Sequence, residues 1–231
     1  MAGMNDLFAD QSIRDRVMTR SDVQALAGSA RTLIGCDLEE ADLSDLDLSG
    51  WTFRQCNLRR ANFGKAMLDR SLWQSCRGAF AGFVGCDLSD ASFSASDFNN
   101  AAMKRSTLEG ARFVGCKLTG ADFSDVKAID LHFEETLLIN ARLTNRSFRK
   151  ARLARVDFSQ ADLRKCDFRM ASFEDCSLRE ALLDAARFEG ADLRGAELGG
   201  VRLGDASLFR GATISREQAA QLLGEIGLKV R

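Results

Sequence analysis

Seven cysteines are the residues of this chain with the most evident chemistry, because thiolates bind metal ions and carry redox reactions. Their numbers all end in 6: Cys36, Cys56, Cys76, Cys86, Cys116, Cys166 and Cys176. None is spaced as CxxC or CxxH, as a metal site would require. Elsewhere the same phase is held by Ser96, Ser106, Val126 and Ala186. Such residues do not replace metal ligands, so we expect seven free thiols that act as small core residues, with no metal and no cofactor.

Other catalytic signals are scarce. His132 is the only histidine, tyrosine is absent, and no Gly-rich phosphate loop, HExxH or GxSxG occurs. His132 directly precedes Phe133, in a phase that should face solvent. Four aspartates recur at one repeat position and are interpreted as fold residues: Asp42, Asp122, Asp162 and Asp192. The sequence therefore predicts that the protein is not an enzyme and has no catalytic residues.

A five-residue repeat positions all of these side chains. Leu or Phe stands at every number ending in 3 or 8 from 33 to 208, except at Trp73, Gly78, Met103 and Ala128. The residue two places earlier is usually small. A step of five residues advances an α-helix by about 140° and reverses the face of a strand, so neither element explains the period. The pattern predicts a solenoid in which each unit forms one side of a coil, with no insertion before Leu208.

The repeat units resemble the consensus of the pentapeptide-repeat family. They include "ADLSD" (41–45), "ANFGK" (61–65), "ADFSD" (121–125), "ADLRK" (161–165) and "ADLRG" (191–195). This resemblance implies an all-β solenoid, a right-handed quadrilateral β-helix of about nine coils over residues 31–210. At a strand spacing of about 4.8 Å, the rod would be roughly 43 Å long. The absence of proline suits a backbone that is hydrogen-bonded almost everywhere.

The two ends depart from the repeat. Residues 1–30 are expected to form an irregular cap or a degenerate first coil, and we favour an irregular strand followed by a short helix near Ser21. Residues 211–231 predict an amphipathic helix that begins with a capping box of Ser215 and Gln218 and stops at Gly227. This helix caps the last coil, and it either does only that or also joins a second copy. The residues assigned to dimerisation are Gln218, Ala219, Leu222, Leu223, Ile226, Leu228 and Val230.

The C-terminal tail is similar to that of the Qnr-type quinolone-resistance proteins and their relatives that protect against albicidin or microcin. The QA..LL...G pattern is matched by Gln218, Ala219, Leu222, Leu223 and Gly227. The resemblance implies an end-to-end homodimer and a DNA mimic that binds DNA gyrase or topoisomerase IV and protects it from poisons such as quinolones. The alternative is a non-enzymatic scaffold or effector rod with an unrelated protein partner.

Charge bears on these two hypotheses. Lys and Arg number 32 against 33 Asp and Glu, which excludes the basic excess typical of direct nucleic-acid binding. No apolar run could span a membrane and no signal peptide is visible, so we expect a cytoplasmic protein. Mimicry of DNA needs only one acidic face. The acidic candidates for partner binding are Asp37, Glu39, Asp42, Asp47 and Asp87.

Two irregular stretches, 71–82 and 126–148, are either decayed repeats or protrusions that bind a partner. Their candidate residues are Trp73, Phe80 and Arg146. Arg146 occupies a small inward phase, where an unpaired guanidinium would cost several kcal/mol. We therefore expect a backbone bulge that lets Arg146 out of the core.

Overall fold

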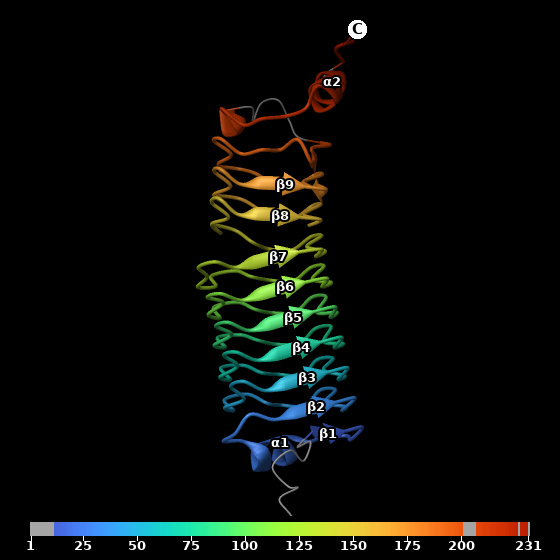
Figure 1. Cartoon of the computed structure of the whole chain (residues 1–231), viewed down its shortest axis with the longest axis vertical. Coiled ribbons are helices and arrows are strands. Elements are labelled where there is room, and N and C mark those ends of the chain that lie inside the picture. Colours follow the sequence, from blue (N-terminus) through green and yellow to red (C-terminus); the bar gives the residue numbers. More distant parts are fainter. Residues whose placement is uncertain (1–11, 201–206, 226, 231) are drawn as a thin grey trace, which may run out of the picture.

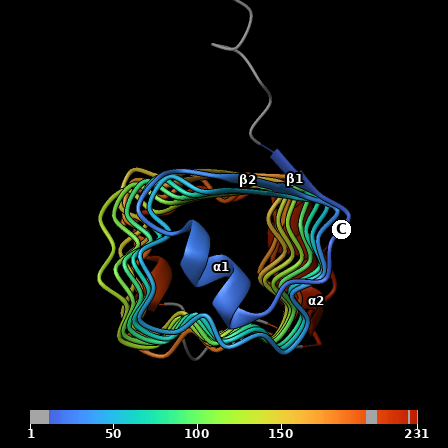
Figure 2. The ribbon, with the colours of Figure 1, turned by 90° about the horizontal axis from the view of Figure 1, so that it is seen from below.

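The chain returns to the same side of a square once every twenty residues, as the strand register shows, and the coils stack into a rod (Figures 1 and 2). The computed structural model describes residues 12–200, 207–225 and 227–230. Thr32 pairs in parallel with Thr52, and Thr52 with Leu72, so that each coil stacks directly on the one before. The expected right-handed quadrilateral β-helix is confirmed, as a solenoid of about nine turns. Neither described helix is long and apolar enough to cross a membrane.

Short strands form one side of the square, and they make a parallel nine-stranded sheet in chain order. They are β1 (Ser12–Arg14), β2 (Thr32–Ile34), β3 (Thr52–Arg54), β4 (Leu72–Gln74), β5 (Ser92–Ser94), β6 (Arg112–Val114), β7 (His132–Glu134), β8 (Arg152–Ala154) and β9 (Ser172–Glu174). The other sides are joined by single bridges at the same spacing, such as Asp42 to Asn62. A second sheet pairs β10 (Cys176–Ser177) with β11 (Ala196–Glu197).

The corners of the square need left-handed backbone at the last residue of each unit. Glu40 and Asp45, for example, have φ of 58° and 59°. Such a conformation costs a non-Gly residue on the order of 1 kcal/mol or more. Each of these amides also donates to the next coil, Glu40 to the carbonyl of Arg59 and Asp45 to that of Gly64, both at 2.9 Å. The ladder therefore holds the corners in place.

Stacked rings fill the interior. Trp73 is fully buried between Phe53 and Phe93, at ring distances of 4.2 and 5.4 Å. Gly78 leaves room for the ring of Phe98, because a Cβ at Gly78 would lie 2.1 Å from Phe98 Cε1. The stretch 71–82 thus keeps the regular coil, and its odd residues compensate one another. Trp73 is wrong as a candidate for partner binding, since no part of it reaches the surface.

The first described coil starts about twenty residues before the regular repeat. Ile13 pairs with Leu33, and Met18 and Val23 are buried in the core. Helix α1 (Arg20–Leu26) begins beside Ser21 and lies across the open end of the coil (Figure 2). Thr19 caps it, exchanging hydrogen bonds with Asp22. The expectation for residues 1–11 lies outside the described residues.

The five-residue frame slips by one residue near the C-terminal end. Asp192 bridges to Thr213, a step of 21 residues, and the ring of Phe209 stacks on Phe188 at 4.7 Å. The expectation that the frame runs unbroken to Leu208 is therefore wrong. Leu208 and Phe209 are adjacent apolar residues, and packing selects the aromatic ring for the Phe column. The repeat positions from 201 to 206 lie outside the described residues.

Candidate functional site

The cysteines line the inner wall and are all free. Cys86 and Cys166 direct their thiols at carbonyl oxygens of the preceding coil, those of Phe63 at 2.8 Å and Leu143 at 3.1 Å. Burial raises the pKa of both thiols to about 12, and that of Cys116 to about 11. Within the described residues no group of His, Cys, Asp or Glu could hold a metal ion. All seven cysteines build the wall, and the thiols of Cys86, Cys116 and Cys166 stay protonated at neutral pH.

The column of Asp42, Asp122 and Asp162 serves the turns of the coil. Each carboxylate accepts a hydrogen bond from the backbone amide two residues ahead, as Asp122 does from Ser124 at 2.9 Å. Cations also neutralise the column: Lys104 lies 3.4 Å from Asp122, and Arg20 lies 3.8 Å from Asp42. This column is therefore no continuous acidic surface.

Asp37 and Glu39 gather on the side that follows β2. Both accept hydrogen bonds from the side-chain Nδ2 of Asn57, at 2.9 and 3.0 Å. The next coil places Arg59 and Arg60 beside them, and Arg60 pairs with Glu40 at 3.2 Å. The acidic cluster is confined to one coil.

A longer acidic surface lies on the side that precedes the strands. It is formed by units 46–50, 66–70, 86–90, 106–110 and 126–130, and its acids are Asp47, Asp69, Asp87, Asp90, Glu109 and Asp130. We call this surface the acidic strip. Among the described residues only Asp69 has an ion-pair partner there, Arg70 at 2.7 Å, and Lys127 is the other cation on it. Six carboxylates over five coils give about one carboxylate per 4 Å, close to the roughly 3.4 Å between phosphates along one DNA strand, and the two cations reduce this to about one net charge per 6 Å.

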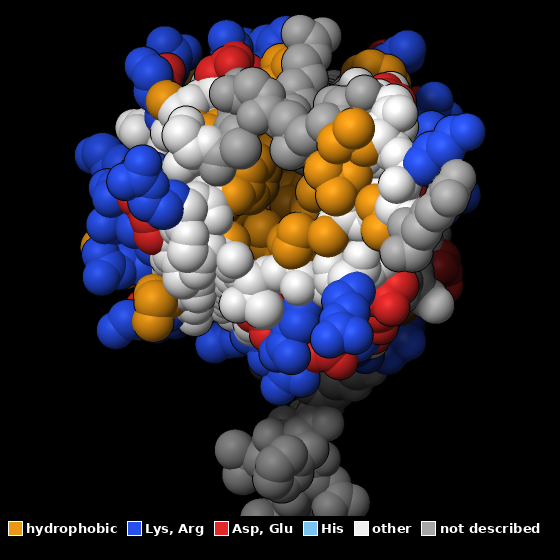
Figure 3. Space-filling view, turned by 90° about the horizontal axis from the view of Figure 1, so that it is seen from above, with side chains coloured by type: hydrophobic (Ala, Val, Ile, Leu, Met, Phe, Trp, Pro, Cys, Tyr) orange, Lys and Arg blue, Asp and Glu red, His pale blue; other side chains and the backbone are white. Residues whose placement is uncertain are grey.

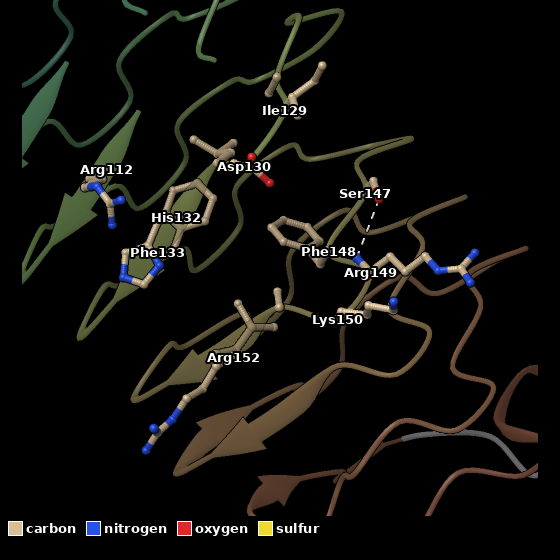
Figure 4. Close-up of a pocket in the computed structure, with 14 residues that line it drawn as sticks. Arg112, Ile129, Asp130, His132, Phe133, Ser147, Phe148, Arg149, Lys150 and Arg152 are labelled. Carbon is tan, nitrogen blue, oxygen red and sulfur yellow. Dashed lines mark hydrogen bonds between the residues drawn. The ribbon is translucent and has the colours of Figure 1, made fainter. Parts of the chain in front are cut away.

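The coil above the acidic strip reverses the charge and opens a cleft. Arg149 and Lys150 are exposed there, at the unit positions that hold acids lower down. A cleft of about 630 Å³ separates the segment 128–133 from the segment 147–153 (Figure 4). We call it the intercoil cleft. It marks the boundary between the acidic and the basic part of this side.

Lost ladder pairing produces the intercoil cleft. Thr107 bridges to Lys127 and Ser147 to Asp167, but Lys127 does not bridge to Ser147. Strands β7 and β8 pair only through Glu134 and Ala154, whereas β6 and β7 pair at three positions. From residue 32 to residue 200, every other step on this side and on the strand side keeps its register up to the last coil.

Arg146 explains the opening. Its guanidinium donates to the carbonyl oxygens of Thr144, at 3.2 Å, and of Val126, the acceptor that the Ser147 amide would otherwise use. The backbone above stays regular, because the Asp167 amide donates to the Arg146 carbonyl at 2.8 Å. The expected bulge is therefore wrong: the side chain leaves the core between two coils and separates them. Ala128, where a Leu or Phe is usual, leaves space below.

Two other candidates are simply placed on the surface. Phe80 is 57% exposed, at the corner that ends its unit. His132 lies at the rim of the intercoil cleft, 3.5 Å from Glu134.

Family comparisons agree with the repeat geometry. A model described as pentapeptide repeat region matches residues 131–208, and one described as pentapeptide repeats (8 copies) matches residues 33–72 and 86–125. Together they cover more than half of the chain. The chain belongs to the pentapeptide-repeat family. No curated protein matches it.

Two solved pentapeptide-repeat structures resemble this one in fold. HetL, involved in heterocyst differentiation regulation in the cyanobacterium Nostoc, is 20% identical with a TM-score of 0.65, over 81% of this chain and 86% of HetL. Full-length QnrB1, a plasmid-mediated fluoroquinolone resistance protein, is 21% identical with a TM-score of 0.54, over 94% of this chain and 97% of QnrB1. At these identities the likeness concerns the fold.

The tail of this pentapeptide-repeat protein forms helix α2 (Arg216–Glu225). The predicted capping box is confirmed, as the Ser215 amide donates to Gln218 Oε1 at 2.6 Å and the Gln218 amide to Ser215 Oγ at 3.1 Å. Gly227 has φ of 86°, and the Leu228 amide closes the helix on the Leu223 carbonyl at 3.0 Å. Gln218 also donates from Nε2 to two carbonyls of the last regular coil, so it attaches the helix to the rod.

Helix α2 lies to one side of the rod and leaves apolar side chains visible at the centre of its end (Figures 1 and 3). None of its described residues is buried, although Leu222 packs against the core. Ala219 and Leu223 are half-buried, and Leu228 and Val230 are 55% and 54% exposed. Ile226 lies outside the described residues. The end of the rod therefore keeps apolar surface that the described residues do not cover.

Proposed function

We propose that this pentapeptide-repeat protein is a DNA mimic that binds DNA gyrase or topoisomerase IV and protects it from poisons such as quinolones. The observation that carries the proposal is the acidic strip. It presents carboxylates coil after coil at nearly the spacing of phosphates along one DNA strand. Surfaces that bind DNA are positively charged, and a rigid row of anions at that spacing attracts them in the same way.

The carboxylates of the acidic strip are also held rigidly in place. Asp47 and Asp87 accept hydrogen bonds from the backbone amides of Ser49 and Ser89, at 3.1 and 3.0 Å, so their carboxylates are fixed to the turns. The coils beneath are held by the backbone ladder. A fixed array loses little conformational entropy when a partner binds, which favours affinity.

The proposed form is an end-to-end homodimer built on helix α2. Leu223, Leu228 and Val230 supply apolar surface that the described part of the chain leaves uncovered. A two-fold contact at this end would bury that surface against its own copy and place the two acidic strips along one longer rod. We place this assembly in the cytoplasm, where type II topoisomerases of bacteria work.

A scaffold that binds an unrelated protein is the second candidate. The other sides of the rod favour it, because ion pairs between neighbouring coils neutralise them locally. Arg155, for example, lies 3.1 Å from Glu134 and 2.7 Å from Glu135, and Arg152 lies 2.8 Å from Glu174. A surface of alternating, paired charges suits a protein partner with a complementary charge pattern better than it suits a DNA-binding groove.

A supercoiling assay with purified gyrase, with and without a quinolone, tests the proposed function. The protein should inhibit supercoiling at high concentration or restore it in the presence of the drug. Absence of inhibition, of protection and of binding would reject the DNA-mimic proposal and favour the scaffold.

A further inference from the structure

We propose that the intercoil cleft is a docking site for an extended acidic peptide segment of a partner protein. The peptide would lie between residues 128–133 and residues 147–153, beside the remaining pair of Glu134 and Ala154, and would bond to the backbone that the ladder leaves free. Asp130 is the only acid of the acidic strip that lines the cleft, so docking there is separate from the proposed mimicry of DNA.

Unpaired backbone groups line both edges of the intercoil cleft. In the regular ladder the amide at the position of Ala128 donates to the next coil, as Leu108 does to Lys127 at 2.7 Å. The amides of Ala128, Asp130, Ser147 and Arg152 make no such bond, although all four lie in described parts of the chain. Their usual acceptors include the carbonyls of Ser147, Arg149 and Leu131, which are freed at the same time. Donors and acceptors thus face each other across the cleft.

This pairing pattern selects an extended main chain. A strand added to an open edge uses both its N–H and its C=O groups, which satisfies both sets of free groups. A small anion such as phosphate would satisfy donors only and leave the carbonyls unpaired. The parallel ladder above and below, intact at β6 and at β9, sets the direction in which the segment would run.

The charge of the lining selects acidic side chains. Arg112, Arg149, Lys150 and Arg152 line the intercoil cleft, against a single acid, Asp130. Arg149 and Lys150 have no ion-pair partner among the described residues, so their charges are available to a ligand. Phe133 and Phe148 form an apolar floor (Figure 4). A segment that alternates acidic and apolar residues would meet the cations with one set and the rings with the other.

The test uses a labelled hexapeptide of alternating Glu and Val, blocked at both ends, and the full-length protein. Fluorescence anisotropy at low ionic strength should show saturable binding, and a Lys–Val peptide of equal length should not bind. The double variant Arg149→Glu with Lys150→Glu should weaken binding at least tenfold. Its matched control is Arg59→Glu with Arg60→Glu, the same unit positions on a distant coil, which should change binding less than twofold.

Amide hydrogen exchange locates the peptide. In the free protein the amides of Ala128, Asp130, Ser147 and Arg152 should exchange rapidly, and the Glu–Val peptide should slow them while leaving β3 and β4 unchanged. Failure of the Glu–Val peptide to bind, binding without this protection, or equal loss in the control variant would overturn the proposal. Protection of the same amides by inorganic phosphate without binding of the peptide would also overturn it, and would assign the cleft to a small anion.

Discussion

Arg146 donates a hydrogen bond to the carbonyl oxygen of Val126, one coil below, and thereby takes the acceptor that the Ser147 amide would use in a regular ladder. A guanidinium cannot remain unpaired in the core, and backbone carbonyls are the nearest acceptors. The guanidinium therefore gains hydrogen-bond acceptors, and the backbone ladder between the two coils loses a hydrogen bond. One inward substitution changes the wall of the rod from closed to open.

The first prediction is that two substitutions close the intercoil cleft. Arg146→Ala combined with Ala128→Leu should restore the ladder between Lys127 and Ser147, because the acceptor is freed and the space below is filled. Each regained hydrogen bond contributes about 0.5–1.5 kcal/mol, so the free energy of unfolding should rise by about 1 kcal/mol or more. Amide exchange at Ser147 should slow at least tenfold. Arg142→Ala, an exposed arginine nearby, is the control and should leave that amide unchanged; continued rapid exchange in the double variant would contradict the explanation.

Substitution by alanine should destabilise the protein at Gly78 but not at Gly82. At Gly78 the new Cβ would lie 2.1 Å from the ring of Phe98, whereas at Gly82 its nearest neighbour is Asn62 Oδ1 at 3.5 Å. Overpacking at Gly78→Ala should cost about 1–3 kcal/mol. Gly82→Ala should stay within about 0.5 kcal/mol of the wild type. Urea denaturation measures both, and equal stabilities would mean that Phe98 does not occupy the space beside Gly78.

Thiol ionisation predicts how stability depends on alkaline pH. Burial raises the pKa of Cys86 and Cys166 to about 12, while thiols of the unfolded chain ionise near 8.5. The folded state therefore holds its thiol protons after the unfolded state has lost them. The contribution of these thiols to the free energy of unfolding is fully present below the pKa of the unfolded state. It is lost as pH rises from about 9 towards 12. Denaturation curves from pH 7 to 11 should show this fall.

All seven thiols can also be counted directly. At pH 8 the native protein should react slowly with a disulfide reagent such as 5,5′-dithiobis(2-nitrobenzoic acid), and the denatured, non-reduced protein should reveal seven groups. Fewer than seven would show that some cysteines are bridged. Fast reaction of the native protein would contradict their burial.

Much of the fold is predictable from the sequence because the interior accepts few residue types. The Leu and Phe phase fixes which residues point inward, and Ala or Cys two places earlier fixes the wall. The slip before Phe209 escapes this reasoning, because Leu208 is as apolar as its neighbour. Trp73 also misleads as an irregularity, since only the structure places it between two rings.

The functional surfaces are harder to predict for a geometric reason. Asp47 and Asp87 share one column at twenty-residue spacing, which the sequence reveals directly. Asp69, Asp90, Glu109 and Asp130 complete the acidic strip from the fourth and fifth positions of their units, so no single column contains them. Arg146 is conspicuous in the sequence, yet whether it bulges outward or separates two coils depends on which carbonyls lie within reach.

The oligomeric state gives a further prediction. Leu223→Arg should place a charge in the apolar end surface and convert an end-to-end dimer into monomers while the coils remain folded. Size-exclusion chromatography with light scattering should give twice the chain's 25.3 kDa for the wild type and that mass for the variant. Gln221→Arg, exposed on the same helix, is the matched control and should stay dimeric. A Leu223→Arg variant that remains dimeric would place the interface elsewhere.

Binding to purified gyrase by matched charge variants tests the central proposal most directly. One variant neutralises four acids of the acidic strip: Asp47→Asn, Asp87→Asn, Asp90→Asn and Glu109→Gln. The other makes the same change in net charge on the remaining sides: Asp45→Asn, Asp125→Asn, Asp175→Asn and Asp184→Asn. We predict that the first loses at least tenfold in affinity for gyrase and in its effect on supercoiling, and that the second stays within twofold of the wild type. Equal behaviour of the two variants, or no binding by the wild-type protein, would contradict mimicry of DNA by the acidic strip.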